Sequence, residues 1–148
     1  MKKIESFKVD HTRVVPGMYI SRVDGDVTTY DLRFCKPNCG VTLAPAAMHT
    51  IEHLFATYIR NTTLDVLYFG PMGCLTGFYL LVRNADHMKV WHEIQKVLSA
   101  IAAFEGEIFG CSEAECGNYR LHDLAGAKEA AAAFYKVMEK EPALTYPA

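Results

Sequence analysis

The sequence has 148 residues, of which 51% are hydrophobic and 22% charged, and its formal net charge is −2 at pH 7. This length suits one domain with its own core, so we expect a single domain over residues 1–148. The small net charge gives no broad basic field for nucleic acid or an anionic membrane surface. No apolar run reaches the roughly 18 residues of a membrane span, and no apolar signal core follows the N-terminal lysines. We therefore expect a cytoplasmic protein that binds neither nucleic acid nor membrane.

The five cysteines argue against a disulfide framework, because their number is odd and no secretion signal is visible. Free, catalytic or metal-bound thiols are the alternatives. Cys35, Cys39, Cys111 and Cys116 could form a structural zinc site, although the spacings C-x3-C and C-x4-C depart from the favoured C-x2-C.

The first half of the chain predicts a β-hairpin. Residues 14–23 and 27–34 are rich in β-branched and aromatic side chains, and Asp24-Gly25-Asp26 between them is a turn signal. Pro16-Gly17 indicates a bulge or an edge position in the first strand. Residues 6–12 could be an edge segment or a loop.

A helix is predicted over residues 45–59, ending near residues 60–61. Pro45 is favoured in a first helical turn, and Thr42 upstream is available as a polar cap.

The second half predicts two strands followed by two helices. Strands at 64–69 and 78–82 flank a glycine-rich turn at 70–77, and helices are expected at 85–104 and 123–140. A hairpin, a helix, two strands and two helices predict an α+β domain, with an antiparallel sheet and helices packed on one face.

The helix over 45–59 contains the pattern H-x-x-E-H, from His49 to His53. Residues four apart on a helix lie above one another, so His49 and His53 share a face and could hold one metal ion. Glu52 lies beside that face, where a carboxylate can move protons next to a metal. The same pattern occurs in inverted zinc proteases. The alternative is a helix with two partly buried histidines and a solvated glutamate.

A catalytic metal site usually has three protein ligands and an open position, so a third ligand must come from elsewhere in the chain. We favour Cys116, which lies in an irregular polar loop next to a glycine, although a buried structural thiol is the alternative. His122 and His11 are the competing third ligands. His87 and His92 are expected to be surface or hydrogen-bonded residues.

Cys74 lies between Gly73 and Gly77, where glycines allow the backbone to approach a ligand closely. A cysteine near a divalent cation ionises more readily, and its thiolate could act as a base or a nucleophile. The alternative is a small apolar residue in a tight turn.

Five sequence blocks of this chain resemble, in the same order, those of the S-ribosylhomocysteine lyases. These are bacterial enzymes that make the precursor of the quorum-sensing signal autoinducer-2. The blocks cover nearly the whole chain: Ser6 to Thr12, Tyr30 to Asn38, His49 to His53, Pro71 to Tyr79, and Glu115 to Tyr119.

The resemblance implies a role for each residue of the H-x-x-E-H helix and for two cysteines. The family's metal ligands match His49, His53 and Cys116. Its two acid–base residues match Glu52 and Cys74. One divalent metal per chain is implied, Fe2+ in the native enzyme, with Zn2+ or Co2+ as substitutes.

The resemblance also implies substrate contacts at Ser6, His11 and Arg33, and a homodimer with active sites at the interface. Its fold resembles that of the inverted zinc proteases. The sequence departs from the family pattern at Gly70, where a serine is usual, and at Leu75, where a polar residue is common; the chain is also slightly short.

The implied reaction cleaves S-ribosylhomocysteine to homocysteine and 4,5-dihydroxypentane-2,3-dione. A metal acidifies the C–H bond next to the sugar carbonyl, the carbonyl migrates along the chain, and β-elimination expels homocysteine thiolate. Glu52 and Cys74 would carry the protons. The homocysteine formed would also serve the methyl cycle, and no nucleotide cofactor is needed. Three rival functions are a small H-x-x-E-H metallopeptidase, a structural zinc protein without catalysis, and a binding module that has lost the chemistry.

Overall fold

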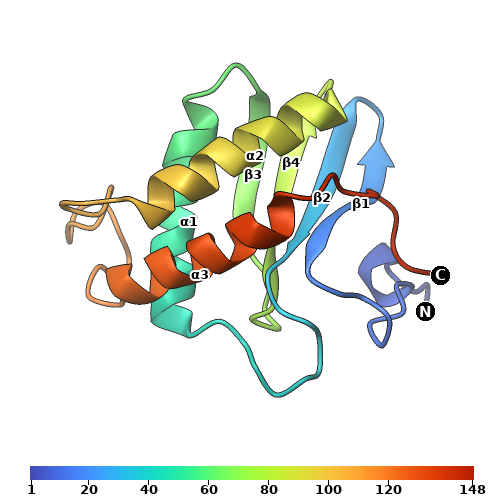
Figure 1. Cartoon of the computed structure of the whole chain (residues 1–148), viewed down its shortest axis with the longest axis horizontal. Helices are drawn as coiled ribbons and strands as arrows, with labels where there is room; N and C mark the ends of the chain where they lie inside the picture. Colours follow the sequence, from blue (N-terminus) through green and yellow to red (C-terminus); the bar gives the residue numbers. More distant parts are fainter.

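A computed structural model describes residues 1–148. One 3-10 turn, four strands and three helices follow in the order η1 (Glu5–Phe7), β1 (Gly17–Asp24), β2 (Val27–Arg33), α1 (Pro45–Arg60), β3 (Asp65–Pro71), β4 (Gly77–Arg83), α2 (His87–Ala102) and α3 (Leu124–Met138). The strands form one antiparallel sheet in the order β1-β2-β4-β3, and the helices lie together on one side of it (Figure 1). The predicted α+β architecture and the predicted hairpin are confirmed.

Every second side chain of the two central strands, β2 and β4, points into the core. Tyr30 and Leu32 of β2 and Phe78 and Leu80 of β4 are fully buried, and they belong to one cluster with Phe55 of α1. Side chains two apart on a strand point to the same face, so this face is the one that the helices cover.

Helix α1 turns one side into this core. Its buried positions include Ile51, Phe55 and Ile59, which recur at helical spacing. The side of α1 that carries His49 and His53 is therefore not used for packing against the sheet.

The start of α1 differs in part from the prediction. Pro45 occupies the first turn as expected, but the capping position is Ala44, and no side chain caps the helix. Thr42 therefore lies too far upstream to act as the predicted cap. In contrast, the side chain of Asp86 caps α2, and that of Asp123 caps α3.

β1 is an edge strand, as Pro16-Gly17 indicated, and it begins at Gly17. The irregularity in its pairing lies further on, between Ile20 and Arg22. Residues 139–148 run beside this edge, where the Ile20 N–H donates to the carbonyl of Leu144 at 2.8 Å. This contact satisfies backbone groups that an edge strand otherwise leaves free.

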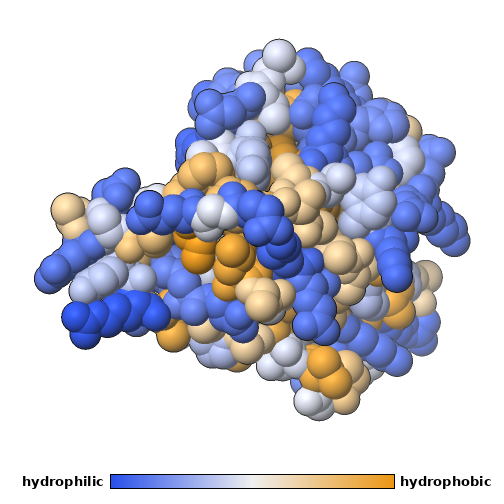
Figure 2. Space-filling view, turned by 60° about the vertical axis from the view of Figure 1, so that its left-hand side comes forward, coloured by the Kyte–Doolittle hydropathy of each residue, from blue (hydrophilic) through white to orange (hydrophobic).

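No helix of the chain combines the length and apolar character required to cross a membrane. The surface is mixed instead: on the face shown in Figure 2, hydrophobic side chains gather in the middle and hydrophilic side chains surround them.

Gly77 starts β4 opposite Arg33 and requires the absence of a side chain. A Cβ atom at this position would collide with the backbone carbonyl oxygen of Leu32, which cannot move without disturbing the β2–β4 ladder. We expect Gly77→Ala to lower the free energy of unfolding by about 1–3 kcal/mol, as overpacking does. Gly73→Ala in the same turn is the matched control, because a Cβ there meets nothing within 4 Å. Urea unfolding of both variants measures the difference, and equal stability would show that the β2–β4 ladder can adjust.

Candidate active site

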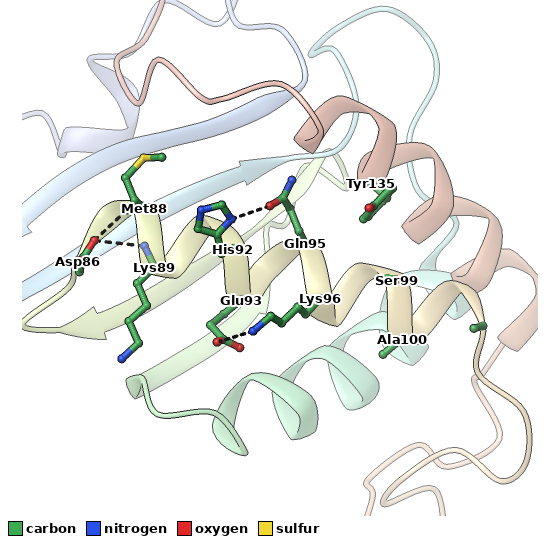
Figure 3. A pocket seen from close by; sticks show the side chains of 11 residues that line it. Asp86, Met88, Lys89, His92, Glu93, Gln95, Lys96, Ser99, Ala100 and Tyr135 are labelled. Atoms are coloured by element: carbon green, nitrogen blue, oxygen red, sulfur yellow. Dashed lines mark hydrogen bonds and ion pairs between the residues drawn. The ribbon is translucent and has the colours of Figure 1, made fainter.

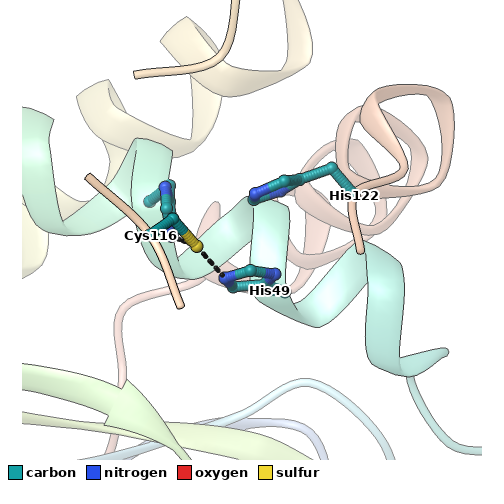
Figure 4. Close-up of side chains that lie close together, drawn as sticks. His49, Cys116 and His122 are labelled. Carbon is teal, nitrogen blue, oxygen red and sulfur yellow. Dashed lines mark hydrogen bonds between the residues drawn. The ribbon is translucent and has the colours of Figure 1, made fainter. Parts of the chain in front are cut away.

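Four side chains of types that can bind a metal, from three parts of the chain, converge beside α1. Helix α1 provides His49 and His53, the loop between α2 and α3 provides Cys116, and His122 directly precedes the cap of α3. One donor atom of each lies within 4.8 Å of those of the other three. Figure 4 shows His49, Cys116 and His122 facing one another from these three elements.

Hydrogen bonds to backbone carbonyls fix the tautomers of the two α1 histidines. His49 Nδ1 lies 2.6 Å from the Leu121 carbonyl oxygen, and His53 Nδ1 lies 2.8 Å from the Phe109 carbonyl oxygen. A carbonyl oxygen only accepts hydrogen bonds, so both Nδ1 atoms carry the proton. Both Nε2 lone pairs are therefore free for a metal, in the arrangement that orients metal-binding histidines generally.

The donor atoms have the spacing of a metal site. Cys116 Sγ lies 3.4 Å from His49 Nε2 and 3.7 Å from His53 Nε2. Tetrahedral bonds of about 2.3 Å to sulfur and about 2.0–2.1 Å to nitrogen predict a separation of about 3.5 Å. The one proton of a thiol also cannot satisfy two lone pairs, whereas a divalent cation satisfies both. The residues thus fit a metal ion.

Thr50 orients the fourth side chain of the cluster. Its hydroxyl donates to the Ala46 carbonyl at 3.1 Å and accepts from the Asp123 N–H and from His122 Nδ1, each at 2.9 Å. His122 Nε2 is then a lone pair, and it is buried without a hydrogen-bond partner. Burial lowers the pKa of the His122 imidazole, and the two neighbouring histidines add to this effect.

The orientations of the imidazole rings indicate which of the three histidines can bind the same metal ion. The lone pair of an imidazole nitrogen lies in the ring plane, so a bound ion lies close to that plane. The rings of His49 and His53 are nearly perpendicular, at 89°, and their planes cross. The rings of His49 and His122 are stacked at 18° with centroids 4.1 Å apart, so an ion in the plane of His49 lies outside the plane of His122.

Glu52 lies beside this cluster and faces the turn that carries Cys74. It lines a hollow of about 250 Å³ together with His49 and with residues 71–73. The Glu52 carboxylate, which the sequence places beside the helix face with His49 and His53, thus lies in a cleft between α1 and the turn after β3.

A second hollow, of about 320 Å³, lies on the other side of the same turn. It brings together Ser6, His11, Arg33 and Cys74, which come from four separate segments, and it also includes residues 71–73. The three predicted substrate-contacting residues therefore share one pocket with Cys74. None of the four belongs to the metal-ligand cluster.

Arg33 is buried at the base of this second hollow. Its guanidinium donates to both carboxylate oxygens of Asp31, at 3.1 and 2.6 Å, and to Thr76 Oγ1 at 2.9 Å. The two charged side chains are only 2% and 1% exposed. Burial alone would lower the pKa of Arg33, but the hydrogen bonds and charge of Asp31 outweigh it and raise the pKa. Arg33 Nη1 also lies 4.0 Å from Cys74 Sγ, which is 3.0 Å from Thr76 Oγ1.

Two alternatives from the sequence are wrong. The four cysteines do not form a zinc site, because Cys116 lies among the histidines and the other three lie outside that group. His11 is not a third ligand, because it lines the Arg33 hollow. His87 and His92 have the expected hydrogen-bonded roles, with Tyr30 and Gln95 as partners.

The largest hollow of the molecule, about 1040 Å³, lies elsewhere, along the outer side of α2. Figure 3 shows Lys96 paired with Glu93, and His92 with Gln95, on this helix surface. These side chains satisfy one another and do not converge on a common point. Size therefore does not identify the active site here.

Comparisons with known proteins agree with this geometry. Residues 4–143 match the family model of S-ribosylhomocysteinase (LuxS). An S-ribosylhomocysteine lyase of Phocaeicola vulgatus is 45% identical, covering 94% of this chain and 92% of its own length. The corresponding proteins of Desulfotalea psychrophila and Porphyromonas gingivalis are 46% and 43% identical, each covering 99% of both chains. On this match over nearly the full length, the chain belongs to the S-ribosylhomocysteine lyase (LuxS) family.

Proposed function

We propose that the protein is a metal-dependent carbon–sulfur lyase that cleaves S-ribosylhomocysteine to homocysteine and 4,5-dihydroxypentane-2,3-dione, the autoinducer-2 precursor. The observation that carries this proposal is a cluster of two histidines and a cysteine near two hollows, one lined by Glu52 and the other by Cys74, that share residues 71–73. A structural zinc site does not require the hollow that contains Cys74 and Arg33. Peptide hydrolysis at a metal does not require a thiol beside a buried guanidinium.

The metal site consists of His49, His53 and Cys116, with one divalent ion per chain. A donor set of two imidazoles and one thiolate suits Fe2+, Zn2+ and Co2+, and we assign Fe2+ as the native ion, with the other two as substitutes. When bound, the ion polarises a carbonyl oxygen of the open-chain sugar and makes the neighbouring C–H bonds acidic. His122 stays outside the ligand set because its ring is stacked on that of His49.

Glu52 and Cys74 move protons between carbon atoms of the sugar, so that the carbonyl migrates until β-elimination can expel homocysteine thiolate. Each lines a hollow next to residues 71–73, one on each side. The positive charge of Arg33, 4.0 Å from Cys74 Sγ, attracts a thiolate there. Ser6, His11 and Arg33 hold the substrate around this thiol.

The active form in this proposal is a homodimer with its active sites at the interface. Within one chain, the metal cluster and the Arg33 hollow share no residue, so each is half of a site. Large apolar side chains near the second half are exposed: Ile4 by 56%, Phe7 by 65% and Tyr68 by 51%. A symmetric interface would bury such side chains. It would also place the metal cluster of each chain next to the Arg33 hollow of the other chain, which gives two active sites per dimer.

The ligand assignment predicts unequal effects of two substitutions on metal content. Cys116→Ala should lose most of its metal, because one of three ligands is gone. His122→Ala should keep about one metal per chain, because an ion in the His49 plane lies outside the plane of His122. Elemental analysis after dialysis measures both. Metal loss in His122→Ala would make this histidine a fourth ligand.

The catalytic assignment predicts inactive variants that retain metal. Glu52→Gln and Cys74→Ala should keep wild-type metal content and lose about 10²–10⁴-fold in turnover, as expected for acid–base groups. The assay incubates the metal-loaded protein with S-ribosylhomocysteine and follows free thiol. Wild-type protein that releases no thiol from this substrate but cleaves a peptide pool would replace the lyase with a peptidase.

Shared active sites predict complementation between two inactive proteins. Cys116→Ala removes the metal half of a site, and Arg33→Ala removes the guanidinium from the substrate half. After random subunit exchange, half of the dimers are hybrids with one intact site each, so about a quarter of wild-type activity should return. If confirmed exchange restores no activity, all these residues act within one chain.

A further inference from the structure

Residues 139–148, which we call the C-terminal segment, run back beside β1 (Figure 1). The Ile20 N–H donates to the carbonyl of Leu144, and the Tyr146 ring stacks on Tyr19 with centroids 4.9 Å apart. The segment is thus fixed both by its backbone and by an aromatic side chain.

Tyr146 makes the one contact of this segment with the buried ion pair. Its hydroxyl donates to Oδ2 of Asp31 at 2.7 Å, the same oxygen that accepts from Nη2 of Arg33. Asp31 is 0% exposed, so its carboxylate depends on protein donors. Burial raises the pKa of Tyr146, and the charge of Asp31 adds to this effect, so the hydroxyl remains a donor.

The network continues from the ion pair to the reactive thiol. Arg33 bonds Thr76, and both Arg33 and Thr76 approach Cys74 Sγ, at 4.0 and 3.0 Å. One chain of contacts therefore joins Tyr146 to Cys74 through Asp31 and Arg33.

We propose that Tyr146 is a positioning residue that acts through Asp31 and controls how far the Arg33 charge is available to Cys74 and to the substrate. The link to substrate rests on the proposed function, whereas the link to Cys74 does not require turnover. By sharing the Asp31 carboxylate, the tyrosine hydroxyl satisfies part of its negative charge. Without this donor, more of the Asp31 negative charge is left unsatisfied. This charge offsets more of the Arg33 positive charge and also opposes a thiolate at Cys74, so both effects make the thiolate less favourable.

Tyr146→Phe tests the proposal because it removes the hydroxyl and keeps the ring that stacks on Tyr19. In the metal-loaded protein, iodoacetamide should modify Cys74 about 2- to 10-fold more slowly, because a less satisfied carboxylate nearby disfavours the thiolate that reacts. Cys39, exposed in another loop, should react at its wild-type rate. Peptide mass spectrometry measures both rates. The KM for S-ribosylhomocysteine should rise more than kcat falls.

Tyr135→Phe is the matched control, since Tyr135 lies on α3 in the hollow beside α2 and has no contact with Asp31. It should leave both alkylation rates unchanged. Deletion of residues 145–148 keeps the Leu144 contact and should reproduce the slower reaction of Cys74.

Three outcomes test the positioning role of Tyr146 and separate it from the proposed function. Unchanged alkylation of Cys74 in folded Tyr146→Phe would overturn the proposal. Faster reaction of Cys74 and Cys39 together would show a merely structural role and would also overturn it. Slower alkylation of Cys74 in a protein that does not cleave S-ribosylhomocysteine would support the positioning role and overturn the proposed function.

Discussion

The site depends on hydrogen bonds between α1 histidines and the loop that connects α2 with α3. The loop has little regular structure, and its carbonyl groups at Phe109 and Leu121 accept the Nδ1 protons of His53 and His49. These bonds orient both rings and at the same time hold the loop against the helix. Gly110, which follows Phe109, has a φ of 66°, a left-handed conformation that glycine adopts at little cost. A bound ion would tie Cys116 to the same two rings, so metal binding and loop order are coupled.

The turn after β3 lies between the hollow with Glu52 and the hollow with Cys74. Leu75 adopts a left-handed conformation, with a φ of 65°, which is unfavourable by roughly 1–2 kcal/mol for a residue with a Cβ. Hydrogen bonds of the Leu75 N–H with the Met72 carbonyl, and of its carbonyl with the Leu43 N–H, hold this conformation. As a result, Cys74 faces the Arg33 hollow while Leu75 lines the hollow with Glu52. The departure from the family pattern at Leu75 thus falls on a strained position between both hollows.

The local periodicity of the sequence predicted much of the fold and, within the site, the histidine pair on α1. The face shared by His49 and His53 follows from a spacing of four on a helix, and the strands follow from their composition and turn signals. Loop composition favours Cys116 as the third ligand and leaves His122 as a rival, because sequence spacing does not indicate which distant residue returns to a helix. The structure brings both residues there. Thr42 failed as a cap because the chain between it and Pro45 is extended rather than helical.

The buried ion pair could not be predicted, since strand alternation alone would place Asp31 and Arg33 on a solvated face. Alternation correctly puts them opposite Tyr30 and Leu32, but residues 4–11 and the C-terminal segment cover that face. No period in the sequence indicates that these two ends of the chain meet there.

Burial of this pair also determines which part of the Arg33 hollow can adapt. A buried charge is tolerated only when its partner and hydrogen bonds are complete, so Arg33 is confined to one position by Asp31 and Thr76. Ser6 and His11 are held differently. The hydrogen bonds around them, such as His11 to the Val9 carbonyl and Lys8 to Glu5, join residues close in sequence and do not reach the sheet. Local contacts of this kind open at little free-energy cost. Residues 4–12 can therefore shift at little cost in free energy, whereas the buried Arg33 guanidinium next to them is held in place.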